Sequence, residues 1–168
     1  MSIAETFLPE FDQEMATTRK FIARTPEDKA AWKPHEKSMS LGRLAQHLAE
    51  IPSWGLQVKE SELDIAPPGA PPYTPTPFTS TAHALAEFDQ HVAATRSLIA
   101  ATSDEEFMKP WTFKMGGQAL FTMPRATMFR TWVLSHTIHH RAQFGVFLRL
   151  NNVPIPGSYG PSADDTGM

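Results

Sequence analysis

Cysteine is absent from this 168-residue chain. Without cysteine the protein can form no disulfide, hold no metal through a thiolate and use no cysteine nucleophile. This composition is compatible with a reducing compartment. Any metal site must therefore be built from nitrogen and oxygen ligands.

An excess of positive charge is also lacking. The formal net charge is -3, and the lysines and arginines are scattered along the chain instead of forming a cluster. Proteins that bind nucleic acid usually carry a clustered basic face, because they neutralise phosphates. We therefore expect no nucleic-acid partner.

Long apolar runs are missing as well. No segment approaches the roughly 18 uninterrupted apolar residues that indicate a transmembrane helix. The first residues, MSIAETFLPEF, have no basic region followed by a long apolar stretch, so they do not resemble a secretory signal. We expect a cytoplasmic protein that does not enter a membrane.

Four segments carry apolar residues at the three-and-four spacing of an amphipathic helix. They cover about residues 3–24, 40–61, 79–101 and 124–150. Pro52 lies inside the second segment and should kink or interrupt that helix, because proline removes a backbone donor. The pattern predicts an all-α four-helix bundle, with residues 1–168 forming a single domain.

Two segments break the helical pattern. Residues 66–77, APPGAPPYTPTP, contain six prolines and predict one long crossover on the surface. Residues 111–121 contain two short apolar runs around Gly116–Gly117, a pair suited to a tight turn. We expect a small β-hairpin-like insertion before the last helix, packed on the bundle because a lone hairpin is marginally stable.

Three histidines fall on the apolar sides of the second and fourth predicted helices. His136 and His140 are four residues apart, so they share one helix face, and that face also carries Phe129 and Val133. His47 is flanked by apolar residues on the buried side of its own helix. Neutral imidazoles are favoured ligands of zinc, nickel, copper and iron, and three of them leave room for water or substrate.

The pattern alone leaves a second interpretation open. An inward-facing histidine is often a hydrogen-bonded core residue, and histidine pairs also occur by chance on surfaces. The spacing is not that of zinc proteases, whose H-E-x-x-H motif supplies a general base; here Thr137, Ile138 and His139 separate the pair. A metal would, however, remove the cost of burying three imidazoles without partners.

Side chains near the three histidines can be interpreted either as part of the site or as ordinary structural residues. Glu50 could reach the site, although its residue type favours solvent. Gln143 could bind a ligand imidazole or cap the apolar stripe, and His139 lies at the edge of that stripe. Trp132 is expected in the core, with a place in a substrate pocket as the alternative. Arg141 should face away from the pair and form a surface or interface ion pair.

The sequence His136-Thr-Ile-His-His140-Arg-Ala-Gln143 resembles the signature of the DinB/YfiT-like superfamily of damage-inducible proteins. The segment Leu44-Ala-Gln-His47-Leu-Ala resembles the first histidine motif of that family, and residues 157–164 resemble its usual chain end. The chain departs from the pattern at Ala142, where glycine is frequent. The resemblance extends over nearly the whole chain.

This resemblance implies a four-helix bundle with one divalent metal, for which zinc and nickel are the leading candidates, on His47, His136 and His140. It also implies a homodimer and a role in stress. Some relatives transfer low-molecular-weight thiols, such as bacillithiol, mycothiol or glutathione, to electrophiles, and one related branch isomerises maleylpyruvate. Many members have no assigned reaction.

Three functions follow as hypotheses. The first is a metal-dependent thiol S-transferase, or a related hydrolase-like enzyme, acting on a small molecule with a thiol cosubstrate. The second is a stress protein that binds a metal or a small ligand without turnover. The third is a structural role in which the histidines are core residues and the protein acts through its dimer surface.

Overall fold

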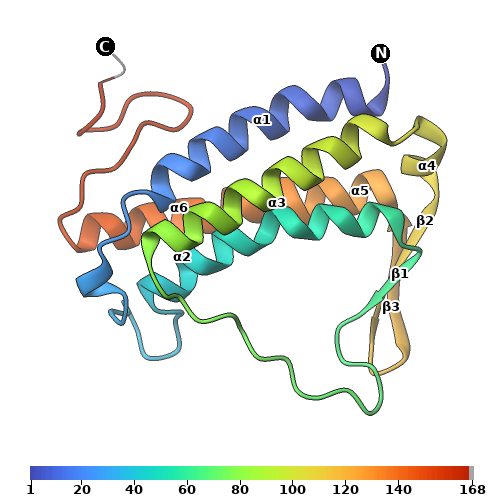
Figure 1. Cartoon of the computed structure of the whole chain (residues 1–168), viewed down its shortest axis with the longest axis horizontal. Helices are drawn as coiled ribbons and strands as arrows, with labels where there is room; N and C mark the ends of the chain where they lie inside the picture. The colour runs from blue at the N-terminus through green and yellow to red at the C-terminus, as the bar shows by residue number, and fades with distance from the viewer. Residues whose placement is uncertain (167–168) are drawn as a thin grey trace.

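The structure is a computed structural model and describes residues 1–166. It confirms a four-helix bundle with a small sheet at one end (Figure 1). The first helix is α1 (Ile3–Ile22), which begins at a capping box formed by Ser2 and Glu5. The third helix is α3 (Thr81–Ala101), capped by the Ser80 side chain.

The second helical segment changes its geometry halfway. The sequence predicted one interrupted helix over 40–61, but α2 (Leu41–Glu50) ends early and continues as a 3-10 helix, η2 (Ile51–Lys59). Pro52 is the physical reason, because its nitrogen cannot donate to the preceding turn. The Pro52 carbonyl instead accepts a 2.7 Å hydrogen bond from Thr95 of α3, which fixes this segment to the bundle.

The last helical segment, predicted as one long helix over about 124–150, also changes its geometry. It comprises α5 (Arg125–Phe129), the π-helix η3 (Arg130–Ser135) and α6 (His136–Leu150). Wider π-helical turns inside α-helices are rare and occur frequently at functional sites. This one lies immediately before His136.

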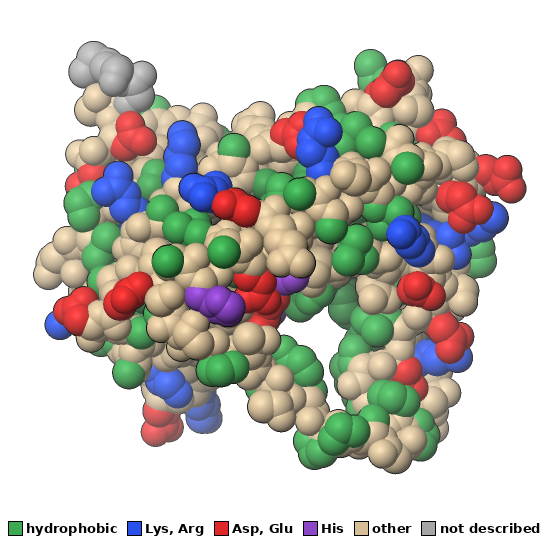
Figure 2. Space-filling model, in the orientation of Figure 1, with side chains coloured by type: hydrophobic (Ala, Val, Ile, Leu, Met, Phe, Trp, Pro, Cys, Tyr) green, Lys and Arg blue, Asp and Glu red, His purple; other side chains and the backbone are tan. Residues whose placement is uncertain are grey.

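The direction of the helices explains the long crossover. Both α1 and α2 pack mainly against α3 and α6, so α1 and α2 lie diagonally across the bundle. Figure 1 shows that α2 and α3 run in the same direction. The chain must therefore return along the bundle between them, as the proline-rich segment does. In Figure 2 an opening separates this crossover from the body of the molecule, with hydrophobic side chains on both sides.

The predicted hairpin is confirmed and gains a third strand. Strands β2 (Pro110–Met115) and β3 (Gln118–Pro124) are antiparallel, and β1 (Glu62–Asp64) adds to β2 in parallel. Gly116 and Gly117 both have positive φ, as the turn requires. The Asp64 carboxylate accepts hydrogen bonds from both of their N–H groups, at 3.1 and 2.7 Å, and ties the crossover to the hairpin.

One hydrophobic core joins all the long helical segments. Its largest fully buried members include Phe11, Phe88, Phe129 and Phe144, one from each of α1, α3, α5 and α6. The remaining helices, η1 (Glu27–Lys29) and α4 (Asp104–Met108), are short connections. Among the helices of residues 1–166, none has the length and apolar character that a membrane span requires.

Candidate metal centre

The three predicted histidines meet where α2 faces the start of α6. Ring nitrogens of His47, His136 and His140 all lie within 4.8 Å of one another. The Nε2 atoms of His47 and His136 are 3.2 Å apart, and the rings of His47 and His140 are 4.6 Å apart between centroids. His47 is buried and the other two are partly buried, so the cluster is only partly shielded from solvent.

The spacing of these nitrogens fits one small divalent cation. Nitrogen–zinc bonds of about 2.0–2.1 Å in a tetrahedral site place two ligand nitrogens about 3.3 Å apart. The 3.2 Å separation of His47 and His136 agrees with that edge. A hydrogen bond between these two nitrogens would also explain their distance, but it would not explain why His140 joins them. The donor set, three imidazoles without thiolate, suits zinc or nickel.

The environment keeps two of the imidazoles neutral. Burial, followed by the neighbouring imidazoles, lowers the pKa of His136 to about 4. Burial also lowers the pKa of His140 to about 4, although its hydrogen bond with Gln143 acts in the opposite direction. A histidine must lose its extra proton before it can hold a metal. These two rings are therefore in the ligand form at neutral pH.

A buried carboxylate lies against the outer nitrogen of His47. Oε2 of Glu50 is 3.5 Å from Nδ1 of His47 and accepts a 3.0 Å hydrogen bond from Arg43. Burial raises the pKa of Glu50, but its interactions with His47, Arg43 and Thr76 outweigh burial and lower it. Glu50 is thus an anion with 8% of its surface exposed, so the prediction that it faces solvent is wrong.

This carboxylate assigns the tautomer of His47. An anion beside Nδ1 stabilises a proton on that nitrogen and leaves the Nε2 lone pair directed at the other histidines. Gln143 does the same for His140, because its Oε1 atom lies 2.8 Å from Nδ1. Both rings are oriented to present Nε2 to the centre of the cluster.

The other two predicted site residues, His139 and Trp132, lie at the edge of the histidine cluster. His139 is exposed and touches only the outer side of the cluster, with its ring 4.9 Å from that of His140. Trp132 is partly buried in an aromatic group that extends from the cluster to the hairpin. Trp54 links the two, with its ring 4.9 Å from His136 and 6.2 Å from Trp132.

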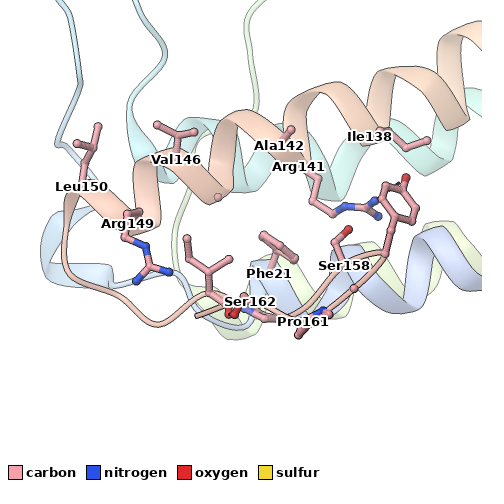
Figure 3. A pocket seen from close by; sticks show the side chains of 15 residues that line it. Phe21, Ile138, Arg141, Ala142, Val146, Arg149, Leu150, Ser158, Pro161 and Ser162 are labelled. Carbon is pink, nitrogen blue, oxygen red and sulfur yellow. Dashed lines mark hydrogen bonds between the residues drawn. The ribbon is translucent and has the colours of Figure 1, made fainter. Parts of the chain in front are cut away.

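Arg141 faces away from the histidines and forms an ion pair, as predicted, but it is buried inside the protein, so the expected position at the surface or an interface is wrong. Its guanidinium forms a 2.6 Å ion pair with Glu14 of α1, and it donates a 3.0 Å hydrogen bond to the hydroxyl of Tyr159. An apolar cavity of about 610 Å³ lies between α6 and the C-terminal segment. Figure 3 shows Arg141 among the side chains that line it, together with Phe21 and Ser158. This cavity is separate from the histidines.

Arg43 was missed in the sequence, although its spacing contained the signal. It precedes His47 by four residues, and Glu50 follows His47 by three, so all three share one face of α2. Its Nη1 atom is buried without a hydrogen-bond partner among the described residues. Arg43 therefore adds a positive charge beside the cluster.

Comparison with known proteins gives this geometry a context. The model of the DinB superfamily matches residues 10–144. The chain is 24% identical over 159 residues to the uncharacterized protein YrdA of Bacillus subtilis strain 168, an alignment that covers 95% of this chain and 89% of YrdA.

Two solved structures share the fold at low identity. A DinB-like protein from Bacillus cereus ATCC 10987 has a TM-score of 0.67 and 21% identity, covering 91% of this chain and 95% of its own. YfiT from Bacillus subtilis has a TM-score of 0.66 and 12% identity, covering 89% and 87%. YfiT is described as a probable metal-dependent hydrolase with an unusual four-helix bundle topology. At these identities the likeness shows the fold alone.

Proposed function

Since the chain belongs to the DinB superfamily, we propose that it holds one divalent metal, zinc or nickel, on His47, His136 and His140 and uses it in thiol or water chemistry. The observation that carries the proposal is the 3.2 Å approach of two Nε2 atoms beside a third imidazole. Three protein ligands are typical of catalytic sites, in which a further coordination position stays open.

The chemistry proposed is transfer of a low-molecular-weight thiol to a small electrophile. A metal bound there would act as a Lewis acid. It would lower the pKa of a bound thiol or water, so that a nucleophile is present near neutral pH. The residues of the chain have two tasks. Glu50 and Gln143 keep His47 and His140 in the required tautomers. Trp54 packs against His136, with Trp132 behind it, and exclusion of water by these aromatic rings would strengthen electrostatic interactions in the site.

A second function, binding without turnover, has one observation in its favour. Enzymes that activate a nucleophile commonly position a general base next to it. The nearest carboxylate, Glu50, is already paired with Arg43 and His47, and no other acidic side chain joins the cluster among residues 1–166. A stress protein that binds a metal or small ligand would need no such base.

The test is product formation by the zinc- and nickel-loaded protein. Glutathione and other small thiols are incubated with an aryl halide, so that a carbon–sulfur bond forms, halide leaves and the thiol proton passes to solvent. We expect a thioether product at a rate above that of His140→Ala. Saturable binding without product would instead support the non-catalytic function. Equal rates in both proteins would contradict the enzymatic proposal.

A further inference from the structure

A second cavity, of about 400 Å³, borders the histidine cluster on the side of His140. His140 and its hydrogen-bond partner Gln143 form part of its wall. The volume lies in the range of small-molecule binding sites. A molecule in this cavity would lie directly against one of the proposed metal ligands.

Most of the remaining wall is aliphatic or aromatic. It is formed by Met39, Leu44, Val146 and Phe147. Met39 and Val146 remain 38% and 57% exposed, although both are apolar. Such side chains favour the hydrocarbon part of a ligand, because binding would remove their surface from water.

The side of the cavity formed by the loop before α2 carries an unpaired positive charge. Lys37 and Ser38 line it, and Lys37 has no ion pair among the described residues. None of the residues that line the cavity is acidic. Lys37 and the hydroxyl of Ser38, which are adjacent in the loop before α2, are donors to an anion. An apolar wall with donors at one end is the arrangement that recognises an organic anion.

The loop that carries Lys37 is fixed at its base to the helix that carries His47. The N–H groups of Leu41 and Gly42 donate 2.8 and 2.9 Å hydrogen bonds to the carbonyls of Trp32 and Ala30. The ring of Trp32 also packs edge-on against Phe147, with centroids 5.6 Å apart. These contacts hold the loop beside α6, so the position of Lys37 is part of the fold.

We propose that this cavity binds the aliphatic carboxylate end of the substrate, with Lys37 as the residue that selects it. The inference rests on the proposed function, since His140, a proposed metal ligand, forms part of the cavity wall. It narrows the substrate class to a short organic carboxylate with its reactive group at the far end. Lys37 contacts the anion and takes no part in holding the metal.

The experiment compares hexanoate with hexan-1-ol, two probes that share an aliphatic chain and differ in charge. Dissociation constants are measured by NMR titration on metal-free and zinc-loaded protein, for wild type, Lys37→Gln and Lys33→Gln. Lys33 is an exposed lysine of the same loop that does not line the cavity, so it is the matched control. We expect hexanoate to bind about tenfold more tightly than hexan-1-ol, as one charge-assisted hydrogen bond predicts. Lys37→Gln should abolish this preference and Lys33→Gln should retain it.

Failure of the inference can be distinguished from failure of the metal proposal. A preference for hexanoate that survives in Lys37→Gln, or no preference in wild type, overturns the inference whether or not metal is bound. On zinc-loaded protein, 6-mercaptohexanoate should bind more tightly than hexanoate, since the proposal requires its thiol to pass His140 and reach the metal. Equal affinities there would overturn the assignment of the cavity to the substrate. Zinc content, measured on the same samples, reports separately on the metal proposal.

Discussion

The Nδ1 atom of His47 lies 3.5 Å from Oε2 of Glu50, within the same helix and away from solvent. The i, i+3 spacing on α2 brings the two side chains together, and Arg43 one turn earlier holds the carboxylate. A carboxylate behind a ligand histidine fixes the ring and increases its basicity. The strength of metal binding should therefore depend on a residue that need not touch the metal.

Glu50→Gln should weaken zinc binding by about ten- to hundredfold, since partners of this kind contribute that much to metal affinity. The variant retains the shape of the side chain and loses its charge. Zinc affinity is measured by competition with a chromophoric chelator. Glu36→Gln, at an exposed position in the preceding loop, is the control and should bind zinc as wild type does. Equal affinity in Glu50→Gln and wild type would show that the carboxylate does not support His47.

The metal-free protein should lose stability as the pH falls from about 6.5 to about 4. Burial lowers the pKa of His136 and of His140 from 6.5 to about 4, so within this window the unfolded chain binds protons that the folded chain does not. Protons therefore favour unfolding within this window. Above about pH 6.5 both histidines are neutral in the folded and the unfolded chain, so this loss of stability is absent. The free energy of unfolding is measured with urea at several pH values.

Carboxylates also titrate at the acidic end of this window, so the decisive comparison is between variants. His140→Gln should show a smaller loss of stability between pH 6.5 and 4 than wild type. His83→Gln, which replaces an exposed histidine on α3, is the matched control. An unchanged pH dependence in His140→Gln would mean that this imidazole does not resist protonation in the folded protein.

Arg141→Met should destabilise the protein by about 3–5 kcal/mol, because it leaves the buried carboxylate of Glu14 without its partner. Arg96→Met removes an exposed ion pair with Asp12 and should cost less than about 1 kcal/mol. Both losses of stability are to be measured by denaturant unfolding. Zinc content of Arg141→Met should equal that of wild type, since Arg141 lies across α6 from the histidines. Equal losses in the two variants would contradict the role assigned to the buried pair.

Much of the fold could be predicted because the helices are amphipathic and their ends carry strong local signals. Apolar periodicity predicted all four helical segments, and Gly116–Gly117 predicted the hairpin turn. Pro52 predicted the interruption of the second helix. Periodicity does not distinguish an α-helix from a 3-10 or π-helix, so the 3-10 geometry after Glu50 and the π-helix before His136 were missed. The strand β1 was missed because three residues are too few to show alternation.

The candidate site was predicted as far as residue type and helix face allow. His47, His136 and His140 carry a recognisable spacing, and the structure brings them together. Their surroundings depend on contacts between distant segments. The burial of Arg141 depends on Glu14, which is 127 residues earlier in the chain, and periodicity on α6 alone cannot reveal that partner.

The most direct test of the metal proposal is elemental analysis of protein purified without a nickel column and then reconstituted with zinc or nickel. Wild type and the exposed control His83→Ala should each contain about one metal ion per chain, as expected for a single three-histidine site. His136→Ala should lose it, and its melting temperature should no longer respond to added metal. Wild type without metal after reconstitution, or His136→Ala with an undiminished content, would contradict the assignment of these three histidines as metal ligands.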